Sequence, residues 1–135
     1  MFSWKRPDNL GVRDGRLAAC KRTPNCVSSQ ADPADRRHYI EPIAFAGVAA
    51  DAMAALQQVV ATAEGAQVVR ATNDYLYAEF RSRVMRFVDD VEFALDPAQG
   101  VIHVRSSARM GIRDFGVNRA RVEALRKALA ATLRR

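Results

Sequence analysis

Apolar and polar residues alternate along the stretch Met85-Arg-Phe-Val-Asp-Asp-Val-Glu-Phe-Ala-Leu95, a pattern that is typical of a β-strand with one buried face. The apolar face of this strand carries Met85, Phe87, Val91, Phe93 and Leu95. Asp89 falls on the same face, where a carboxylate is costly unless it is paired and hydrogen-bonded. We therefore expect Asp89 to have a cationic partner or to be protonated, whereas Asp90 points to the opposite face.

Three further strand-like runs, over residues 66–71, 75–81 and 101–106, are joined to this stretch by short connections. Short connections favour an antiparallel meander, in which each strand pairs with the next along the chain. The register between the third and fourth strands follows from burying the apolar side chains of both. It predicts five opposed pairs: Leu95 with Ile102, Phe93 with Val104, Glu92 with Arg105, Asp90 with Ser107, and Asp89 with Ala108.

Residues 47–63 and 117–133 carry apolar side chains at three- and four-residue steps, which predicts two amphipathic helices. Asn118 is expected to cap the second helix. The predicted fold is α+β: a four-stranded antiparallel meander sheet covered on one face by two helices, in the order helix-strand-strand-strand-strand-helix. Residues 1–37 lack a sustained apolar period, so we expect an irregular arm packed on the sheet, with 38–135 forming the core of one domain.

The composition fits a single globular domain. The chain has 135 residues, of which 49% are hydrophobic and 27% charged, and this balance excludes wholesale disorder. No apolar run reaches the roughly 18 residues that a membrane-spanning helix needs. The first residues contain no apolar core of a secretory signal. We therefore expect a small soluble protein of the cytoplasm, without a transmembrane segment.

The positive charge is concentrated in the C-terminal part of the chain. The formal net charge is +6, and residues 105–135 hold nine basic and two acidic side chains, which gives +7. The remainder holds twelve basic and thirteen acidic side chains, which gives −1. A basic segment attracts phosphate groups and nucleic acid. No aromatic stacking platform accompanies these arginines, so nucleic acid is not the expected partner.

Five residues separate the two cysteines, Cys20 and Cys26, a spacing that differs from the paired cysteines of zinc sites. The only histidines are His38 and His103, so we expect neither a metal site nor a cofactor. A disulfide is sterically possible across this loop, but the lack of a signal peptide favours a reducing compartment and free thiols. Cys26 would then be a candidate nucleophile if a base lowered its pKa.

Residues 105–121 are rich in polar side chains and lie beside the two aspartates in the predicted register. Arg109 is the first candidate to neutralise Asp89, and Arg119 is the second. A structural ion pair that pins the loop is the alternative interpretation. Residues 111–116 precede a helix N-terminus, where backbone N–H groups attract anions, but they match neither a P-loop nor a dinucleotide fingerprint.

Three motifs occur in order along the chain: Cys20-Lys-Arg-Thr-Pro-Asn-Cys-Val-Ser-Ser29, Phe87-Val-Asp-Asp-Val-Glu92 and Arg105-Ser-Ser-Ala-Arg-Met-Gly-Ile-Arg-Asp-Phe-Gly-Val-Asn-Arg119. Together they resemble the bacterial and plastid family catalogued as domain of unknown function 1499, over residues 7–133. The resemblance implies no activity, but it groups the polar positions that match the motifs. These are Asn25, Cys26, Ser28, Ser29, Asp89, Asp90, Arg105, Ser107, Arg109, Asp114, Asn118 and Arg119.

The sequence is most consistent with a binding module for a small anionic ligand. Arginine, serine and cysteine side chains of the grouped positions would line its site, because guanidinium and hydroxyl groups suit carboxylate or phosphate. A structural or protein-interaction domain is the first alternative, in which the same side chains tie the arm to the sheet. A hydrolase or transferase that uses Cys26 or a serine is the second.

Overall fold

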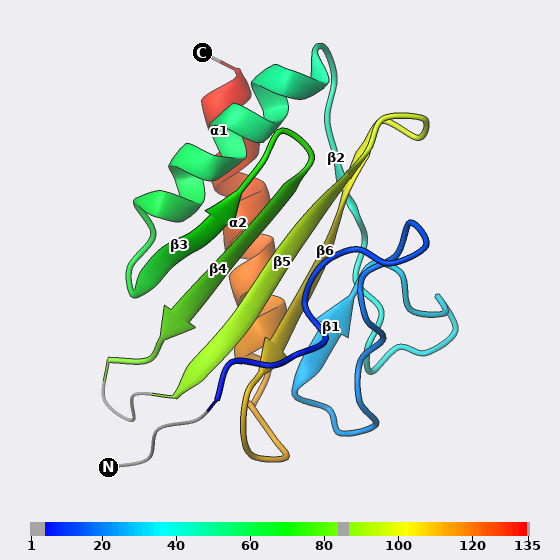
Figure 1. Cartoon of the computed structure of the whole chain (residues 1–135), viewed down its shortest axis with the longest axis vertical. Coiled ribbons are helices and arrows are strands. Elements are labelled where there is room, and N and C mark those ends of the chain that lie inside the picture. The colour runs from blue at the N-terminus through cyan, green and yellow to red at the C-terminus, as the bar shows by residue number, and fades with distance from the viewer. Residues whose placement is uncertain (1–4, 84–86, 135) are drawn as a thin grey trace.

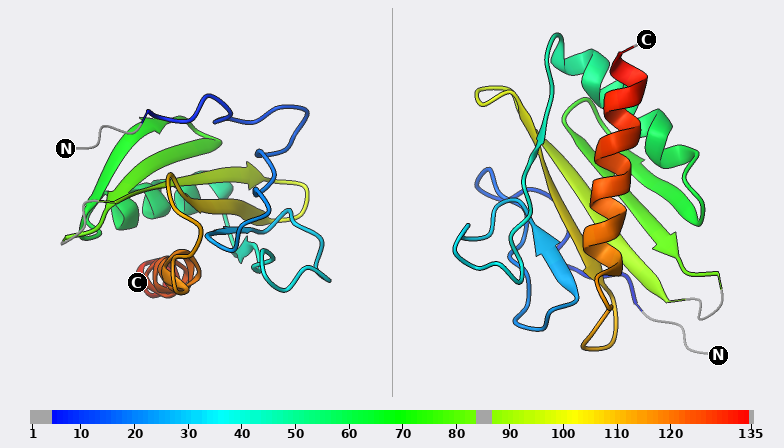
Figure 2. Two further views of the ribbon diagram at one scale, coloured as in Figure 1. Left: turned by 90° about the horizontal axis from the view of Figure 1, so that it is seen from below. Right: turned by 180° about the vertical axis from the view of Figure 1, so that it is seen from behind.

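The computed structural model describes residues 5–83 and 87–134, which form one antiparallel sheet with two helices on a single face (Figures 1 and 2). The elements in chain order are β1 (Cys26–Ser28), β2 (Ile43–Ala44), α1 (Ala49–Ala61), β3 (Ala66–Ala71), β4 (Tyr75–Arg81), β5 (Val88–Asp96), β6 (Val101–Ala108) and α2 (Val117–Leu133). The α+β class and the helix-strand-strand-strand-strand-helix order are confirmed.

The sheet has two strands more than the predicted meander. Its order is β1-β6-β5-β4-β3, and β2 also pairs with β6. Both additional strands are short: β1 lies in the arm that was predicted to be irregular, and β2 directly follows Pro42. They form because β6 would otherwise be an open edge, and β1 pairs with its C-terminal half while β2 pairs with its start. The prediction of four strands was therefore wrong at this edge.

The predicted register between β5 and β6 is confirmed at every pair. Leu95 lies opposite Ile102, Phe93 opposite Val104, Glu92 opposite Arg105, Asp90 opposite Ser107, and Asp89 opposite Ala108. Phe87, in contrast, precedes β5 and is exposed, so its predicted place on the apolar face was wrong. Met85, which the same pattern placed on that face, lies outside the described residues.

The helix-covered face of the sheet holds the main apolar core. Its fully buried side chains include Val91, Phe93, Ile102 and Val104 from the sheet, Leu56 and Val60 from α1, and Val122 and Leu129 from α2. Complete burial of such a side chain stabilises the fold by about 1.5–3 kcal/mol. These contacts fix both helices across the sheet and set the register that positions the polar side chains of β5 and β6.

The start of α2 differs from the predicted cap. The N-cap residue is Gly116, in the left-handed conformation at φ 80°, and Asn118 lies inside the first turn. Asp114 supplies the cap, because its carboxylate accepts hydrogen bonds from the backbone N–H groups of Gly116 and Asn118 at 2.9 and 3.0 Å. The buried Asn118 side chain is thereby available to Ser106, whose hydroxyl donates to its Oδ1.

The N-terminal segment crosses the face of the sheet opposite the helices (Figure 2, left). Leu17 packs there against Tyr75, Tyr77 and Ala94. This small apolar cluster is the only hydrophobic packing that the described part of the arm contributes on this face, which we call the outer face. The rest of the contact between arm and outer face is polar.

Candidate anion-binding site

Three carboxylates lie buried on the outer face. Strand alternation brings Glu79 of β4 and Asp90 of β5 opposite each other, and Glu92 lies two residues further along β5. All three are at most 2% exposed. A buried ionised carboxylate requires a nearby cation or several hydrogen bonds. The site is therefore described by the cations and donors that contact each of the three carboxylates.

Arg109 compensates Asp90 and Glu79. Its Nε and Nη2 donate to the two Asp90 oxygens at 3.1 and 2.7 Å, and Nη2 also lies 2.8 Å from Glu79 Oε2. Arg6 of the arm donates to the same Glu79 oxygen at 2.7 Å, and the Tyr77 hydroxyl donates to both carboxylates. Burial alone would raise the pKa of Glu79, but the hydrogen bonds from Arg6, Arg109 and Tyr77 lower this pKa to about 2.

Glu92 and Arg105 form a less complete pair. One Glu92 oxygen accepts hydrogen bonds from the Tyr75 hydroxyl and from the backbone N–H of Gly11 at 2.6 Å. The other, Oε1, lies 3.6 Å from Arg105 Nη1, which is beyond hydrogen-bond distance. No described residue bonds to this Glu92 oxygen or accepts from Arg105 Nε, although both atoms are buried. Arg105 is only 5% exposed, and its burial lowers the pKa of the guanidinium.

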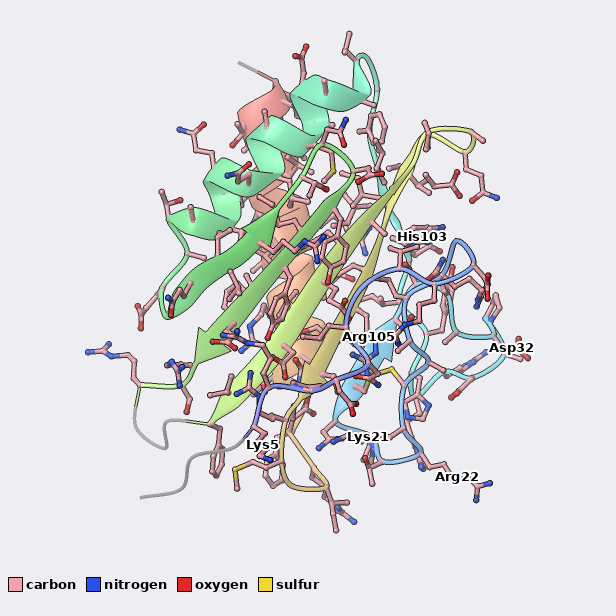
Figure 3. All side chains as sticks on the ribbon, viewed as in Figure 1. Lys5, Lys21, Arg22, Asp32, His103 and Arg105 are labelled. Atoms are coloured by element: carbon pink, nitrogen blue, oxygen red, sulfur yellow. A yellow bond between two sulfur atoms is a disulfide. The ribbon has the colours of Figure 1, made fainter. Side chains whose placement is uncertain are left out.

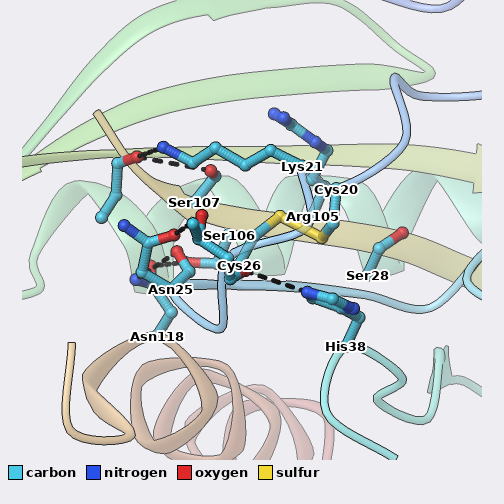
Figure 4. Close-up of a disulfide and its surroundings, with 12 residues drawn as sticks. Cys20, Lys21, Asn25, Cys26, Ser28, His38, Arg105, Ser106, Ser107 and Asn118 are labelled. Carbon is cyan, nitrogen blue, oxygen red and sulfur yellow. Dashed lines mark hydrogen bonds between the residues drawn. A yellow bond between two sulfur atoms is a disulfide. The ribbon is translucent and has the colours of Figure 1, made fainter. Parts of the chain in front are cut away.

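Lys21 reaches the same region from the hairpin between the cysteines (Figures 3 and 4). Its Nζ donates to the Ala108 carbonyl oxygen at 3.0 Å, and no carboxylate of the described ranges lies within ion-pair distance of it. Burial and the neighbouring Arg105 charge lower the pKa of Lys21. The ammonium group therefore lies beside a second, incompletely paired cation.

A pocket of about 300 Å³ separates the arm and hairpin from the outer face. Three cations and one carboxylate line it: Lys21, Arg105, Arg109 and Asp90. Ser107 adds a hydroxyl group, and Cys20 closes one side. Because Asp90 already binds Arg109 with both oxygens, the charge that remains to be compensated at this pocket is positive.

The two cysteines form a disulfide, so the prediction of free thiols was wrong. The Pro24-Asn25 turn brings Cys26 back to Cys20, with 5.7 Å between their Cα atoms, a separation well suited to a disulfide. Cys26 is fully buried and has no thiolate to act as a nucleophile in this state. The structural consequence is a closed hairpin that presents Lys21 to the pocket.

Asn25 fastens this hairpin to the loop after β6. Its side-chain amide donates to the carbonyl oxygens of Gly111 at 2.8 Å and Met110 at 3.4 Å, while its Oδ1 accepts from the Thr23 hydroxyl. Asn25 is fully buried, so these bonds replace those that it would make to water. Asn25 is therefore a positioning residue and does not line the pocket.

Both serines after the disulfide cap backbone groups. The Ser28 hydroxyl accepts from the N–H of Gln30 at 3.1 Å, and the Ser29 hydroxyl accepts from the N–H of Val104 at 2.9 Å. Ser29 also contacts His103 Nδ1 at 3.0 Å. Both serines therefore tie backbone groups together, and neither lines the pocket.

Asp89 is buried on the helix face, as its position in the strand predicted, but its partner was predicted wrongly. Arg121 of α2 lies 2.7 Å from the Asp89 carboxylate and also covers the Phe80 ring. Arg109 instead lies on the outer face, the side that strand alternation gives it after Arg105 and Ser107, so it cannot pair with Asp89 on the helix face. Burial raises the pKa of Asp89, and the charge of Arg121 reduces this rise.

Arg119, the second predicted partner of Asp89, also lies elsewhere. Its Nη2 donates to the carbonyl oxygens of Arg36, Arg37 and Tyr39, which fixes the loop before β2. Of the twelve grouped positions, the structure thus brings four to the pocket: Asp90, Arg105, Ser107 and Arg109. It places Asp89, Asp114, Asn118 and Arg119 on the helix side or around the start of α2.

Several residues of the outer face were not predicted from the sequence to be part of the site. Tyr75, Tyr77 and Glu79 alternate along β4 and share a face with Glu92, a signal that could have been read once the meander was assumed. Nothing in the pattern of the irregular arm points to Lys21 or Arg6. Their places depend on the path of the arm across the sheet.

Within residues 5–83 and 87–134 no group of three or more histidine, cysteine, aspartate or glutamate side chains is arranged to hold a metal ion. None of the helices in these ranges is long and apolar enough to cross a membrane. A family described as "Protein of unknown function (DUF1499)" matches residues 16–129. No curated protein and no solved structure matches the chain.

Proposed function

The chain belongs to the DUF1499 family of proteins of unknown function, and from the geometry of its outer face we propose that it is a binding module for a small anion. The anion would occupy the pocket between the disulfide hairpin and the sheet. One observation carries the proposal: the buried Arg105 side chain lines this pocket, while among the described residues its Nε has no acceptor and its closest carboxylate lies at 3.6 Å. A bound oxyanion would supply the charge-assisted hydrogen bonds that Arg105 lacks.

The lining favours a compact carboxylate or phosphate. Guanidinium groups bind both through paired hydrogen bonds, and an ammonium group adds a mobile point charge. Arg105 and Lys21 provide these two groups, and the Ser107 hydroxyl can donate to a further oxygen. A volume of about 300 Å³ is at the small end for ligand pockets, so we propose an anion with few heavy atoms.

Arg109 and Arg105 differ in how closely carboxylates pair with them, and this difference favours a binding function over a purely structural one. Arg109 binds two carboxylates at hydrogen-bond distances, as expected of an ion pair that holds the fold together. Arg105 has one carboxylate at 3.6 Å. A structural domain without a ligand, the first alternative, would be supported if the pocket bound no anion.

Calorimetric titration with inorganic phosphate, and separately with acetate, tests the proposal. Lys21→Gln should weaken binding about tenfold, which corresponds to 1.4 kcal/mol. Arg22→Gln is the matched control, because it removes the same charge from the next residue, which does not line the pocket. Its affinity should stay within about twofold of the wild type.

Two outcomes would contradict the proposal. One is the absence of measurable binding of either anion to the wild-type protein at millimolar concentrations. The other is an equal loss of affinity in Lys21→Gln and Arg22→Gln, which would show that only the net charge matters. Thermal unfolding of each variant identifies any loss that comes from misfolding. We expect a small effect, because Lys21 and Arg22 are surface residues and Lys21→Gln removes only the hydrogen bond to Ala108.

A further inference from the structure

We propose a second site, on the loop between β6 and α2, that docks the protein on the surface of a membrane rich in anionic phospholipids. The loop projects beyond the end of β6 (Figure 1, orange). Two large apolar side chains lie on it in contact with solvent: Phe115 is 92% exposed and Ile112 is 64% exposed. Val117, the first residue of α2, extends this apolar surface.

The backbone at Phe115 is strained as well as exposed. Its φ of 55° lies in the left-handed region, which a bulky residue rarely adopts outside a functional constraint. An exposed aromatic ring gains nothing from burial in the fold, so the side chain does not stabilise the protein. Its exposure is explained if the ring is buried in a second phase.

A hollow of about 610 Å³ lies directly behind this apolar tip. Four arginines and one carboxylate line it: Arg36, Arg37, Arg113, Arg119 and Asp114. The Asp114 carboxylate is held by the backbone at the start of α2, and Arg119 by backbone carbonyl oxygens. The side chains of Arg36, Arg37 and Arg113 form no hydrogen bond or ion pair with any residue in the described ranges.

The loop combines exposed apolar side chains with neighbouring unpaired arginines, and an anionic bilayer surface offers a complementary apolar layer and phosphate layer. The aromatic and aliphatic groups enter the boundary between headgroups and acyl chains, and the guanidinium groups bind the phosphates above it. A bilayer fits this site better than an acidic protein partner, because the exposed apolar groups are confined to Ile112, Phe115 and Val117 on one short loop and do not form an extended face. The two proposed sites use different residues, so each can fail alone.

Co-sedimentation with vesicles of phosphatidylcholine mixed with phosphatidylglycerol tests the inference, with pure phosphatidylcholine vesicles for comparison. The wild-type protein should bind the anionic vesicles, and less so as salt rises. Phe115→Asn should weaken this binding about tenfold, because it removes the ring while asparagine tolerates a positive φ. Val48→Asn is the matched control, since Val48 is 63% exposed and lies before α1, away from the hollow.

The arginines are tested by the double variant Arg36→Gln/Arg37→Gln against the control Arg83→Gln/Lys127→Gln, which removes the same charge from exposed positions elsewhere. Only the first should lose about tenfold in vesicle affinity. Lys21→Gln should bind vesicles like the wild type. The midpoint of thermal unfolding of Phe115→Asn should not fall, because the substitution relieves backbone strain.

Three results would overturn the inference. They are no binding to anionic vesicles, equal binding to pure phosphatidylcholine, and unchanged binding by Phe115→Asn or by the arginine double variant. Complete displacement of the protein from vesicles by excess inorganic phosphate at constant ionic strength would also overturn it. The ligand of the hollow would then be a free anion and not a headgroup in a bilayer.

Discussion

The two faces of the sheet are buried in different ways. On the helix face, apolar side chains pack against one another, and the ion pair of Asp89 with Arg121 lies beside them. On the outer face, three carboxylates, two tyrosines and Arg105 are buried under an arm that offers little apolar surface. Amphipathic helices can cover a sheet through the hydrophobic effect, whereas an irregular arm has to be fixed by hydrogen bonds and charge.

The buried charged groups also differ in how completely they are paired. Asp89 on the helix face and Asp90 on the outer face each have an arginine at 2.7 Å. Arg105, also on the outer face, has neither an acceptor for Nε nor a carboxylate closer than 3.6 Å. Arg105 and Glu92 thus stay incompletely paired beside the pocket, whereas Asp89 and Asp90 are paired, and the proposed ligand accounts for this difference.

The largest stability effect should follow the loss of Arg109. Arg109→Ala leaves Asp90 and Glu79 buried with fewer donors, and we expect the free energy of unfolding to fall by about 3–5 kcal/mol. Urea unfolding measures this loss. Arg81→Ala is the control, because Arg81 lies 3.6 Å from the same Glu79 but is half exposed, and it should cost less than about 1 kcal/mol. Equal effects of the two substitutions would remove the distinction between a buried and a peripheral arginine.

Acid should affect the two faces with opposite sign. The pKa of Glu79 is lowered to about 2, so its ionised form stabilises the fold above its usual pKa of 4.5, and this contribution is lost as pH falls toward 2. The pKa of Asp89 is raised, so its protonated form stabilises the fold below its usual pKa of 3.8, and this contribution is lost as pH rises through the folded-state pKa.

Urea unfolding of Glu79→Gln and Asp89→Asn between about pH 2 and pH 7 checks this prediction. The advantage of the wild type over Glu79→Gln should be about 3 kcal/mol at most near neutral pH and should shrink in acid. The stability of the wild type relative to Asp89→Asn should increase in acid. Parallel curves for the two variants would show that the two faces do not differ electrostatically.

A smaller effect is expected on the helix face. Arg121→Ala removes the partner of Asp89 and its contact with the Phe80 ring, and we expect the free energy of unfolding to fall by about 1–3 kcal/mol. The loss is limited because Asp89 can take up a proton, so the double variant Arg121→Ala/Asp89→Asn should recover part of it. A loss larger than that of Arg109→Ala would reverse the proposed ranking of the two faces.

The alternation of residues in β5 and β6 was sufficient to predict their register and the pairing of Glu92 with Arg105, because strand geometry links neighbouring positions directly. The same alternation excludes Arg109 as the partner of Asp89, because residue 109 follows Arg105 and Ser107 on the outer face. It could not predict the actual partner, since Arg121 approaches from a helix that the strand pattern does not position. Lys21 and Arg6 reach the outer face only through the path of the arm, which carries no periodic signal.

The state of the two cysteines was also predicted wrongly from the sequence. Free thiols were predicted from the expected compartment, whereas the hairpin geometry brings the two sulfur atoms together. Disulfides persist in oxidising compartments and are rare in reducing ones. The cytoplasmic location therefore stays a prediction, and the disulfide weighs against it.

We propose that Arg105 holds an anion in the outer-face pocket. The most direct test is nuclear magnetic resonance of the Arg105 Nε–H group during a titration with inorganic phosphate. The resonance should shift saturably, with the dissociation constant found by calorimetry, and more than that of Arg109, whose Nε already donates to Asp90. An Arg105 resonance that stays in place while phosphate saturates the protein would contradict the claim.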